Sequence, residues 1–124
     1  MKISCGVDII EIDRIKESIE QIGEKFLKRV FTDNEIQYCE SRKKQKYQHY
    51  AGRFAAKEAA FKAISEKIDD KYSICWKDFE VINNQQGRPC IKLVGIDEKT
   101  IESIDVSISH CKKYAIANVT VLFR

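Results

Sequence analysis

The sequence has only one proline and five glycines in 124 residues, and it contains no internal repeat and no low-complexity tract. Nothing in it therefore marks a linker or a domain boundary. A chain of 124 residues is long enough for one buried core and too short for a separate regulatory domain. We expect residues 1–124 to form a single domain.

A long hydrophobic run is also missing, since Asp8 interrupts the first apolar stretch. That stretch is too short for a signal peptide or a membrane helix, so we expect a cytoplasmic location and no membrane partner. The cysteines are odd in number and never occur in CxxC spacing, which favours neither a disulfide framework nor a thiolate zinc site. We expect most of them to be small, reduced core residues. They are Cys5, Cys39, Cys75, Cys90 and Cys111.

Several catalytic signatures are absent as well. The sequence has no Walker A loop, no G-x-G-x-x-G fingerprint and no G-x-S-x-G elbow, so it holds no nucleotide or serine nucleophile in those ways. The net charge of +3 is too small to indicate nucleic acid by itself. Between Ser41 and Lys57, however, all charged residues are basic. This run is either a solvated helix face or a site for a polyanion or an acidic protein.

The hydrophobic pattern predicts one strand, then helices, then four strands, which is an α+β arrangement. Helix starts are indicated by Asp13 as an N-cap and by the capping box from Thr32 to Glu35, and Gly23 predicts a break. The expected elements are a buried strand at 3–10, helices at 13–30 and from Asp33, the longest helix at 44–67, strands at 74–81 and 91–93 joined by a turn at 83–89, a short helix at 97–103, and strands at 105–110 and 114–123.

The longest expected helix carries a charge on its apolar side. At roughly 100° per residue, Glu58 falls in the middle of an aromatic stripe, where an unpaired carboxylate is costly. Two partners remain open: Lys62, one turn later, in an ion pair, or a divalent cation such as magnesium, which binds carboxylates, waters and substrate phosphates. The stripe comprises Tyr47, Tyr50, Ala51, Phe54 and Phe61.

Two strands contain further polar anomalies. Asp8 interrupts an apolar strand, so it is either a second metal ligand or a residue that caps the following helix or faces solvent. In the segment Ser107-Ile108-Ser109-His110, alternation places His110 on the face of Ile108, away from both serines. A lone histidine there is more often a hydrogen-bonded core residue than a catalytic one.

Five motifs along the chain resemble, in order and spacing, those of the bacterial holo-acyl-carrier-protein synthases. The resemblance spans nearly the whole chain and implies a phosphopantetheinyl transferase-like fold, with a long central helix packed on an antiparallel sheet. It also implies transfer of the 4'-phosphopantetheine arm from coenzyme A to a serine of apo acyl carrier protein, with release of adenosine 3',5'-bisphosphate, in support of fatty acid biosynthesis. The motifs are Gly6-Val7-Asp8-Ile9 with Arg14, Phe31-Thr32-Asp33-Asn34-Glu35, Arg53-Phe54-Ala55-Ala56-Lys57-Glu58-Ala59 with Lys62, Gly87-Arg88-Pro89 and Ser107-Ile108-Ser109-His110.

The resemblance implies roles for individual residues. Asp8 and Glu58 would ligate magnesium, and Lys62 would face the phosphates. Glu58 or a metal-bound water would take the serine proton, and the catalytic set would also include His110. The coenzyme A pocket would be lined by Lys62, Ser109 and His110, with Gly87, Arg88 and Pro89 near the adenosine end.

Partners follow from the same resemblance. Arg14 and Arg53 would meet the acidic carrier protein, and their charge would speed association. The family is typically a homotrimer with sites at subunit interfaces, and no nucleic acid partner is implied. Two departures are Gln86, in place of the first residue of an N-G-x-P loop, and Phe54, where another aromatic is common. The alternative from a different class is a non-enzymatic basic adaptor that binds an acidic protein or RNA through residues 41–57, in which Asp8 and Glu58 are dispensable.

Overall fold

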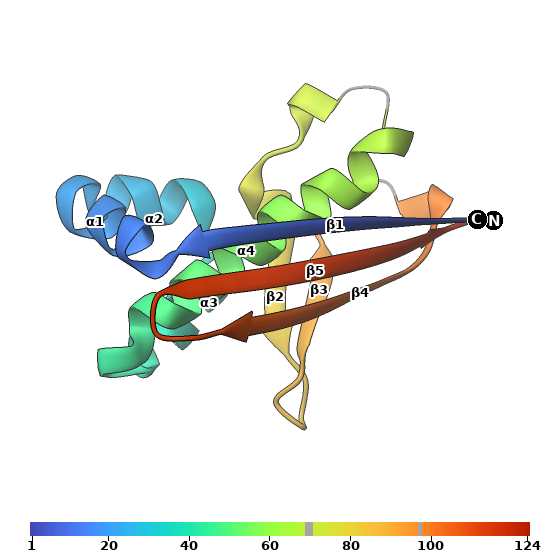
Figure 1. Ribbon diagram of the computed structural model, residues 1–124. Coiled ribbons are helices and arrows are strands. Elements are labelled where there is room, and N and C mark those ends of the chain that lie inside the picture. The colour runs from blue at the N-terminus through green and yellow to red at the C-terminus, as the bar shows by residue number, and fades with distance from the viewer. Residues whose placement is uncertain (69–70, 97) are drawn as a thin grey trace.

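Figure 1 shows the computed structural model, which describes residues 1–68, 71–96 and 98–124. Three long strands form an antiparallel sheet in the order β1-β5-β4. They are β1 (Lys2–Glu11), β4 (Ile101–His110) and β5 (Tyr114–Phe123). Because β5 pairs with both neighbours, β1 and β4 form the two opposite edges of this sheet. The predicted α+β class is confirmed.

The α-helices follow β1 in the sequence. They are α1 (Ile12–Ile22), α2 (Glu24–Val30), α3 (Asp33–Ser41) and α4 (Lys46–Ile64). The break at Gly23 is confirmed, and its φ of +76° explains why glycine stands there. The capping box is also confirmed, since the Thr32 hydroxyl accepts from the Glu35 amide at 3.3 Å and Glu35 accepts from the Thr32 amide at 2.8 Å. The N-cap prediction was wrong: β1 runs directly into α1, so Glu11 holds that position and Asp13 lies in the first turn.

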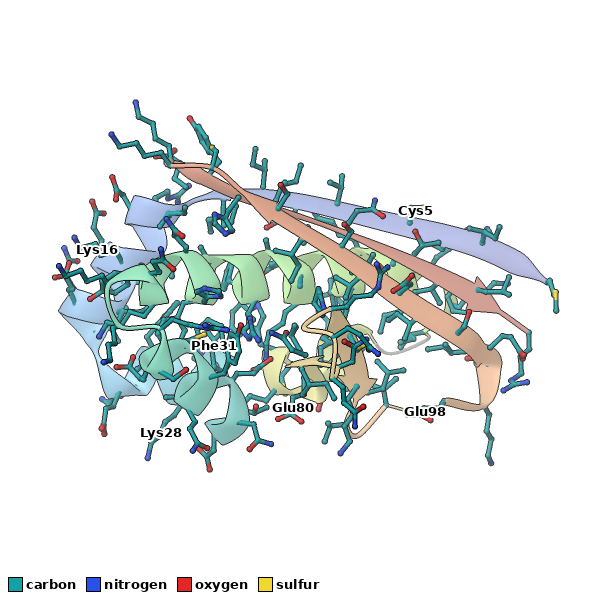
Figure 2. The ribbon with its side chains drawn as sticks, turned by 90° about the horizontal axis from the view of Figure 1, so that it is seen from below. Cys5, Lys16, Lys28, Phe31, Glu80 and Glu98 are labelled. Atoms are coloured by element: carbon teal, nitrogen blue, oxygen red, sulfur yellow. The ribbon has the colours of Figure 1, made fainter. Side chains whose placement is uncertain are left out.

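The central helix α4 is the longest, as expected, although its α-helical part is shorter than predicted because a 3₁₀ turn lies at each end, Lys43–Gln45 and Ser65–Lys67. Figure 2 shows α4 as a middle layer: the sheet covers one side, and α3 with the hairpin of β2 (Phe79–Asn83) and β3 (Pro89–Leu93) lies on the other. No helix in the described part of the chain is long and apolar enough to cross a membrane.

The side of α4 that faces the sheet is built from small residues. Ala55, Ala59 and Ala63 are completely buried, whereas Phe54 and Phe61 of the predicted aromatic stripe are only partly covered. Opposite this face lies Gly6 of β1, where an added Cβ would sit 2.0 Å from the carbonyl oxygen of Ala59. The backbones of α4 and β1 are therefore in direct contact, and any residue other than glycine would push them apart.

Strand β1 is covered on one face only, so the prediction of a buried strand was wrong. Gly6, Asp8 and Ile10 face α4, while Ile3, Val7 and Ile9 alternate onto the outer face and are each more than half exposed. Nothing in the described residues covers that face. The exposed apolar surface continues onto β5 through Tyr114 and Ile116.

The second half of the chain departs from prediction at two points. The strand expected from Ile74 begins only at Phe79, because Trp76–Asp78 forms a 3₁₀ turn that the Asp78 carboxylate closes by accepting from the Cys75 amide at 2.9 Å. The short helix expected at 97–103 is a 3₁₀ turn at Glu98–Thr100, followed directly by β4, and residue 97 lies outside the described residues.

Of the five free cysteines, Cys39 is buried and Cys90 partly covered, whereas Cys5, Cys75 and Cys111 are exposed, so the expectation of core cysteines was wrong. For Cys5 the reason is its place on the uncovered face of β1.

A buried ion pair joins α3 to α4. Lys57 and Glu35 are both fully buried, and Nζ of Lys57 lies 2.6 Å from Oε1 of Glu35. The same Nζ donates to the carbonyl oxygens of Val30, Trp76 and Phe79 at 2.9, 3.2 and 2.8 Å. One ammonium group therefore fixes α2, α3 and the start of the hairpin on α4.

Candidate active site

The two misplaced acids come from the two elements that meet at the contact of α4 with β1. Asp8 points toward α4 because it shares the covered face of β1 with Gly6, and Glu58 precedes Ala59, which touches Gly6. Asp8 and Glu58 line one pocket of about 350 Å³, together with Phe54 and Tyr114. Both residues thus line the same cavity, as the resemblance implies for a shared site, and Asp8 lies in the middle of a strand rather than at a helix cap.

Lys62 spans the same contact one turn further along α4. Its Nζ lies 3.3 Å from Oδ1 of Asp8 and donates to the carbonyl oxygen of Val7 at 3.0 Å. The simpler alternative, an ion pair between Glu58 and Lys62, is not formed among the described residues. Lys62 instead neutralises the acid on β1, and half of its side chain remains exposed.

Glu58 is held from the other direction by a residue that the sequence analysis missed. The indole Nε1 of Trp76 donates to Oε1 of Glu58 at 2.9 Å. A second pocket of about 340 Å³ adjoins this contact, lined by Glu58, Trp76, Phe61 and Cys75 among others. Glu58 therefore lines both pockets.

Arg14 lies beside the first pocket. It is exposed in the first turns of α1 and lines the pocket of Asp8 and Glu58. A cation at the mouth of an acidic pocket provides a contact point for an acidic partner next to the carboxylates.

A second polar cluster lies toward the opposite edge of the sheet. His110, at the end of β4, lies on the α4 side of the sheet, away from both serines as predicted, and its ring centroid is 6.3 Å from that of His49. His110 is exposed, so it is not the core histidine that the sequence favoured. His49 packs edge-on against Tyr38, and the guanidinium of Arg53 stacks on Tyr38 at 4.1 Å. Arg53 is only 4% exposed, and its Nε has no hydrogen-bond partner in the described residues.

The cluster is electropositive. Burial lowers the pKa of His49, and the nearby charges of Arg53 and Arg42 lower it further. Arg42 also stacks on Tyr38, at 4.8 Å. A buried, unpartnered guanidinium nitrogen amid further cations is the environment of an anion site.

The loop between β2 and β3 lies on this second side. Figure 1 shows it projecting beyond the β4 edge. Asn84 organises the loop by accepting from the amides of Gln86 and Arg88, both at 2.9 Å, and Gly87 has a φ of +82°, which glycine adopts without strain. Arg88 pairs with Asp105 of β4 at 3.3 Å, and Pro89 begins β3.

The predicted site residues therefore fall into two groups. Asp8, Glu58, Lys62 and Arg14 lie at the β1 side, whereas the other predicted residues lie at the β4 side. Ser109 is exposed on the outer face of the sheet and does not share a face with His110. Arg53 is too deeply buried to offer a surface to a carrier protein. The second group comprises Arg53, Gly87, Arg88, Pro89, Ser109 and His110.

Comparison with known proteins shows the family to which the chain belongs. Residues 4–119 match the 4'-phosphopantetheinyl transferase superfamily. The holo-[acyl-carrier-protein] synthase of Ruminiclostridium cellulolyticum is 45% identical, over 98% of this chain and 92% of that protein. The chain belongs to the holo-[acyl-carrier-protein] synthases.

Solved structures of the family agree. The Helicobacter pylori holo-[acyl-carrier-protein] synthase in complex with coenzyme A is 32% identical, with a TM-score of 0.82 over 95% of this chain and 99% of that one. The Bacillus anthracis synthase, in complex with CoA (3',5'-ADP), is 34% identical, with a TM-score of 0.78 over 95% and 94% of the two chains. The expected long helix packed on an antiparallel sheet is therefore the fold of this family.

Proposed function

We propose that this chain is a magnesium-dependent synthase that transfers the 4'-phosphopantetheine arm of coenzyme A to a serine of an apo acyl carrier protein, in support of fatty acid biosynthesis. The observation that carries the proposal is the pocket shared by Asp8 and Glu58, in a chain of this family. We expect residues 1–124 to act as one domain, since the buried hydrophobic residues form two clusters that both include residues of α4 and both pack against Ile10.

The two acids fit a magnesium ion by the chemistry of their donor atoms. Lys62 contacts Asp8 through Oδ1, and Trp76 contacts Glu58 through Oε1. Among the described residues the second oxygen of each carboxylate has no protein partner. Magnesium is bound by one or two carboxylates, with waters and substrate phosphates in its remaining positions. When bound, it would neutralise the charge that develops on the pyrophosphate.

The chain's own groups supply the rest of the chemistry. In the reaction the serine oxygen forms a bond to the phosphorus next to pantetheine, the pyrophosphate P–O bond breaks, and adenosine 3',5'-bisphosphate leaves. Lys62 would bind a phosphate oxygen, and either Glu58 or a metal-bound water would accept the serine proton. Arg14, beside the same pocket, would receive the acidic carrier protein.

The second cluster fits the anionic, adenosine end of coenzyme A. His110 and Arg88, both exposed on the β4 side, would meet its phosphates, and the buried Arg53 would add positive charge behind His49 and Tyr38. We therefore propose a role for Arg53 beside coenzyme A in place of the carrier-protein contact that the resemblance implied.

The two groups of residues lie at opposite edges of one sheet, so a single chain offers two half-sites. We infer that the complete site forms where the β1 side of one copy meets the β4 side of another. The uncovered apolar face of β1 and β5 supplies a surface for such contacts. A cyclic homotrimer would satisfy every half-site.

The assembly can be tested with two defective subunits. Co-expression of Glu58→Gln with a His110→Ala/Arg88→Ala chain should restore about a quarter of the wild-type transfer rate per site, because random pairing rebuilds an intact interface in one of four cases. Co-expression of Glu58→Gln with Asp8→Asn is the control, since both changes damage the same half. Equal, negligible recovery in both mixtures would contradict the composite site.

The transferase itself is tested by intact mass. Apo acyl carrier protein incubated with this chain, coenzyme A and magnesium should gain one phosphopantetheine group, and a chelator should prevent the gain. Several acidic carriers that all keep their mass would argue against the assignment. The basic-adaptor alternative instead requires a salt-sensitive affinity for RNA or an acidic protein that survives loss of Asp8 and Glu58. It is weakened by the burial of Arg53 and Lys57, which removes two cations from its surface.

We further propose that the enzyme works in the cytoplasm. All five cysteines are free, which suits a reducing compartment.

A further inference from the structure

Trp76 is the only tryptophan of the chain, and its one polar group contacts a carboxylate of the candidate site. The donor and acceptor come from separate elements, the 3₁₀ turn Trp76–Asp78 and α4. The tryptophan side chain has one hydrogen-bond donor and no acceptor. In Trp76 that donor is used by Oε1 of Glu58.

The indole is fixed before any ligand binds. The backbone carbonyl of Trp76 accepts from Nζ of the buried Lys57 at 3.2 Å. The turn that carries Trp76 is closed by the hydrogen bond from the Asp78 amide to the Cys75 carbonyl at 3.0 Å. The ring packs against Phe54, with centroids 6.0 Å apart. Lys57 and Glu58 are consecutive on α4, so one helix turn fixes both the tryptophan backbone and the carboxylate that its side chain reaches.

We propose that Trp76 is a positioning residue for the metal ligand Glu58. The indole N–H occupies Oε1 and fixes the carboxylate plane, and this presents the other oxygen to the pocket shared with Asp8. A glutamate loses rotamer freedom when it ligates a metal, and a donor that fixes it in advance removes that loss from metal binding. The inference rests on the proposed magnesium site and adds a residue to it that touches neither metal nor substrate.

Trp76→Phe tests the role because it keeps an aromatic ring against Phe54 and removes only the donor and part of the ring. Magnesium is titrated into the enzyme with saturating coenzyme A and no carrier protein, so no transfer occurs, and binding is followed by calorimetry. The magnesium dissociation constant should rise about 10-fold or more, as for other outer-shell partners of metal ligands. Lys77→Ala changes an exposed side chain in the same turn and should leave the constant unchanged.

A finer variant is available because the chain has one tryptophan. Growth of a tryptophan auxotroph on β-(3-benzothienyl)alanine replaces that residue alone and exchanges the indole N–H for sulfur at nearly constant shape. Its magnesium affinity should fall as in Trp76→Phe while the thermal midpoint stays near the wild-type value. A purely packing role would leave the affinity intact in this variant.

The hydrogen bond has a signature of its own. The single indole N–H resonance in a ¹⁵N spectrum should move on Glu58→Gln and again on addition of magnesium. If Glu58→Gln abolishes magnesium binding while Trp76→Phe and the sulfur variant bind as tightly as wild type, the positioning role is overturned and the metal site stands. If Glu58→Gln binds magnesium normally, the metal site itself fails and the role of Trp76 falls with it.

Discussion

Replacement of Glu58 by glutamine should reduce transfer of phosphopantetheine by about 10²- to 10³-fold, because a preorganised charge that stabilises the transition state is lost. The isosteric amide can still accept the Trp76 indole N–H, so the packing of α4 is preserved. Asp8→Asn should act similarly, with an added effect on Lys62, which loses its ionic partner. The rate is measured by intact mass of the carrier protein over time.

The fold must be shown to survive these changes. Circular dichroism and the urea midpoint of both variants should stay close to wild type, since Glu58 is only partly buried and Asp8 lies beside a half-exposed lysine. Raising the magnesium concentration should recover part of the activity if the loss is in metal affinity. Two fully active variants would remove the basis for the proposed chemistry.

Lys57→Met should cost about 3–5 kcal/mol of stability, because it leaves Glu35 buried without a cation. The three carbonyl oxygens that Lys57 now serves would also lose their donor. Urea unfolding gives the free energy directly. Arg124→Met, which removes a cation from the exposed pair with Glu102, should cost less than about 1 kcal/mol.

A double variant separates charge from packing. Glu35→Gln in the Lys57→Met background removes the orphaned charge while an amide oxygen can still accept a backbone amide, so it should recover part of the loss. Equal costs for Lys57→Met and Arg124→Met would mean that the buried pair does not stabilise the fold as we infer.

Much of the fold and one half of the site could be predicted from the sequence. The helix around Glu58 and the capping box at Thr32 were predictable because propensity and local hydrogen bonding decide them. The meeting of Asp8 with Glu58 came from motif order, since no local rule relates residues that far apart. Gly6 allows the two acids to approach, because its missing Cβ lets the backbone of β1 contact the carbonyl of Ala59. This contact is visible only in the structure.

What the sequence could not reveal depends on tertiary partners. Trp76 fitted the period of a strand, and nothing nearby in the sequence indicates that Asp78 closes a turn or that the indole reaches Glu58. Likewise, the apolar pattern of β1 predicts burial, but hydrophobicity does not say whether a face is covered by the same chain. His49 and Tyr38, which complete the second cluster, lie in helices where a polar aromatic residue is ordinary.

The contact at Gly6 also sets how accurately the two carboxylates are spaced. Side chains between a helix and a sheet act as adjustable spacers, and they repack when temperature or sequence changes. No side chain lies between Gly6 and Ala59. Asp8 follows Gly6 by two residues, and Glu58 immediately precedes Ala59. The distance between their α-carbons is therefore set by covalent dimensions and hard-sphere contact, so it should be among the least variable distances in the molecule.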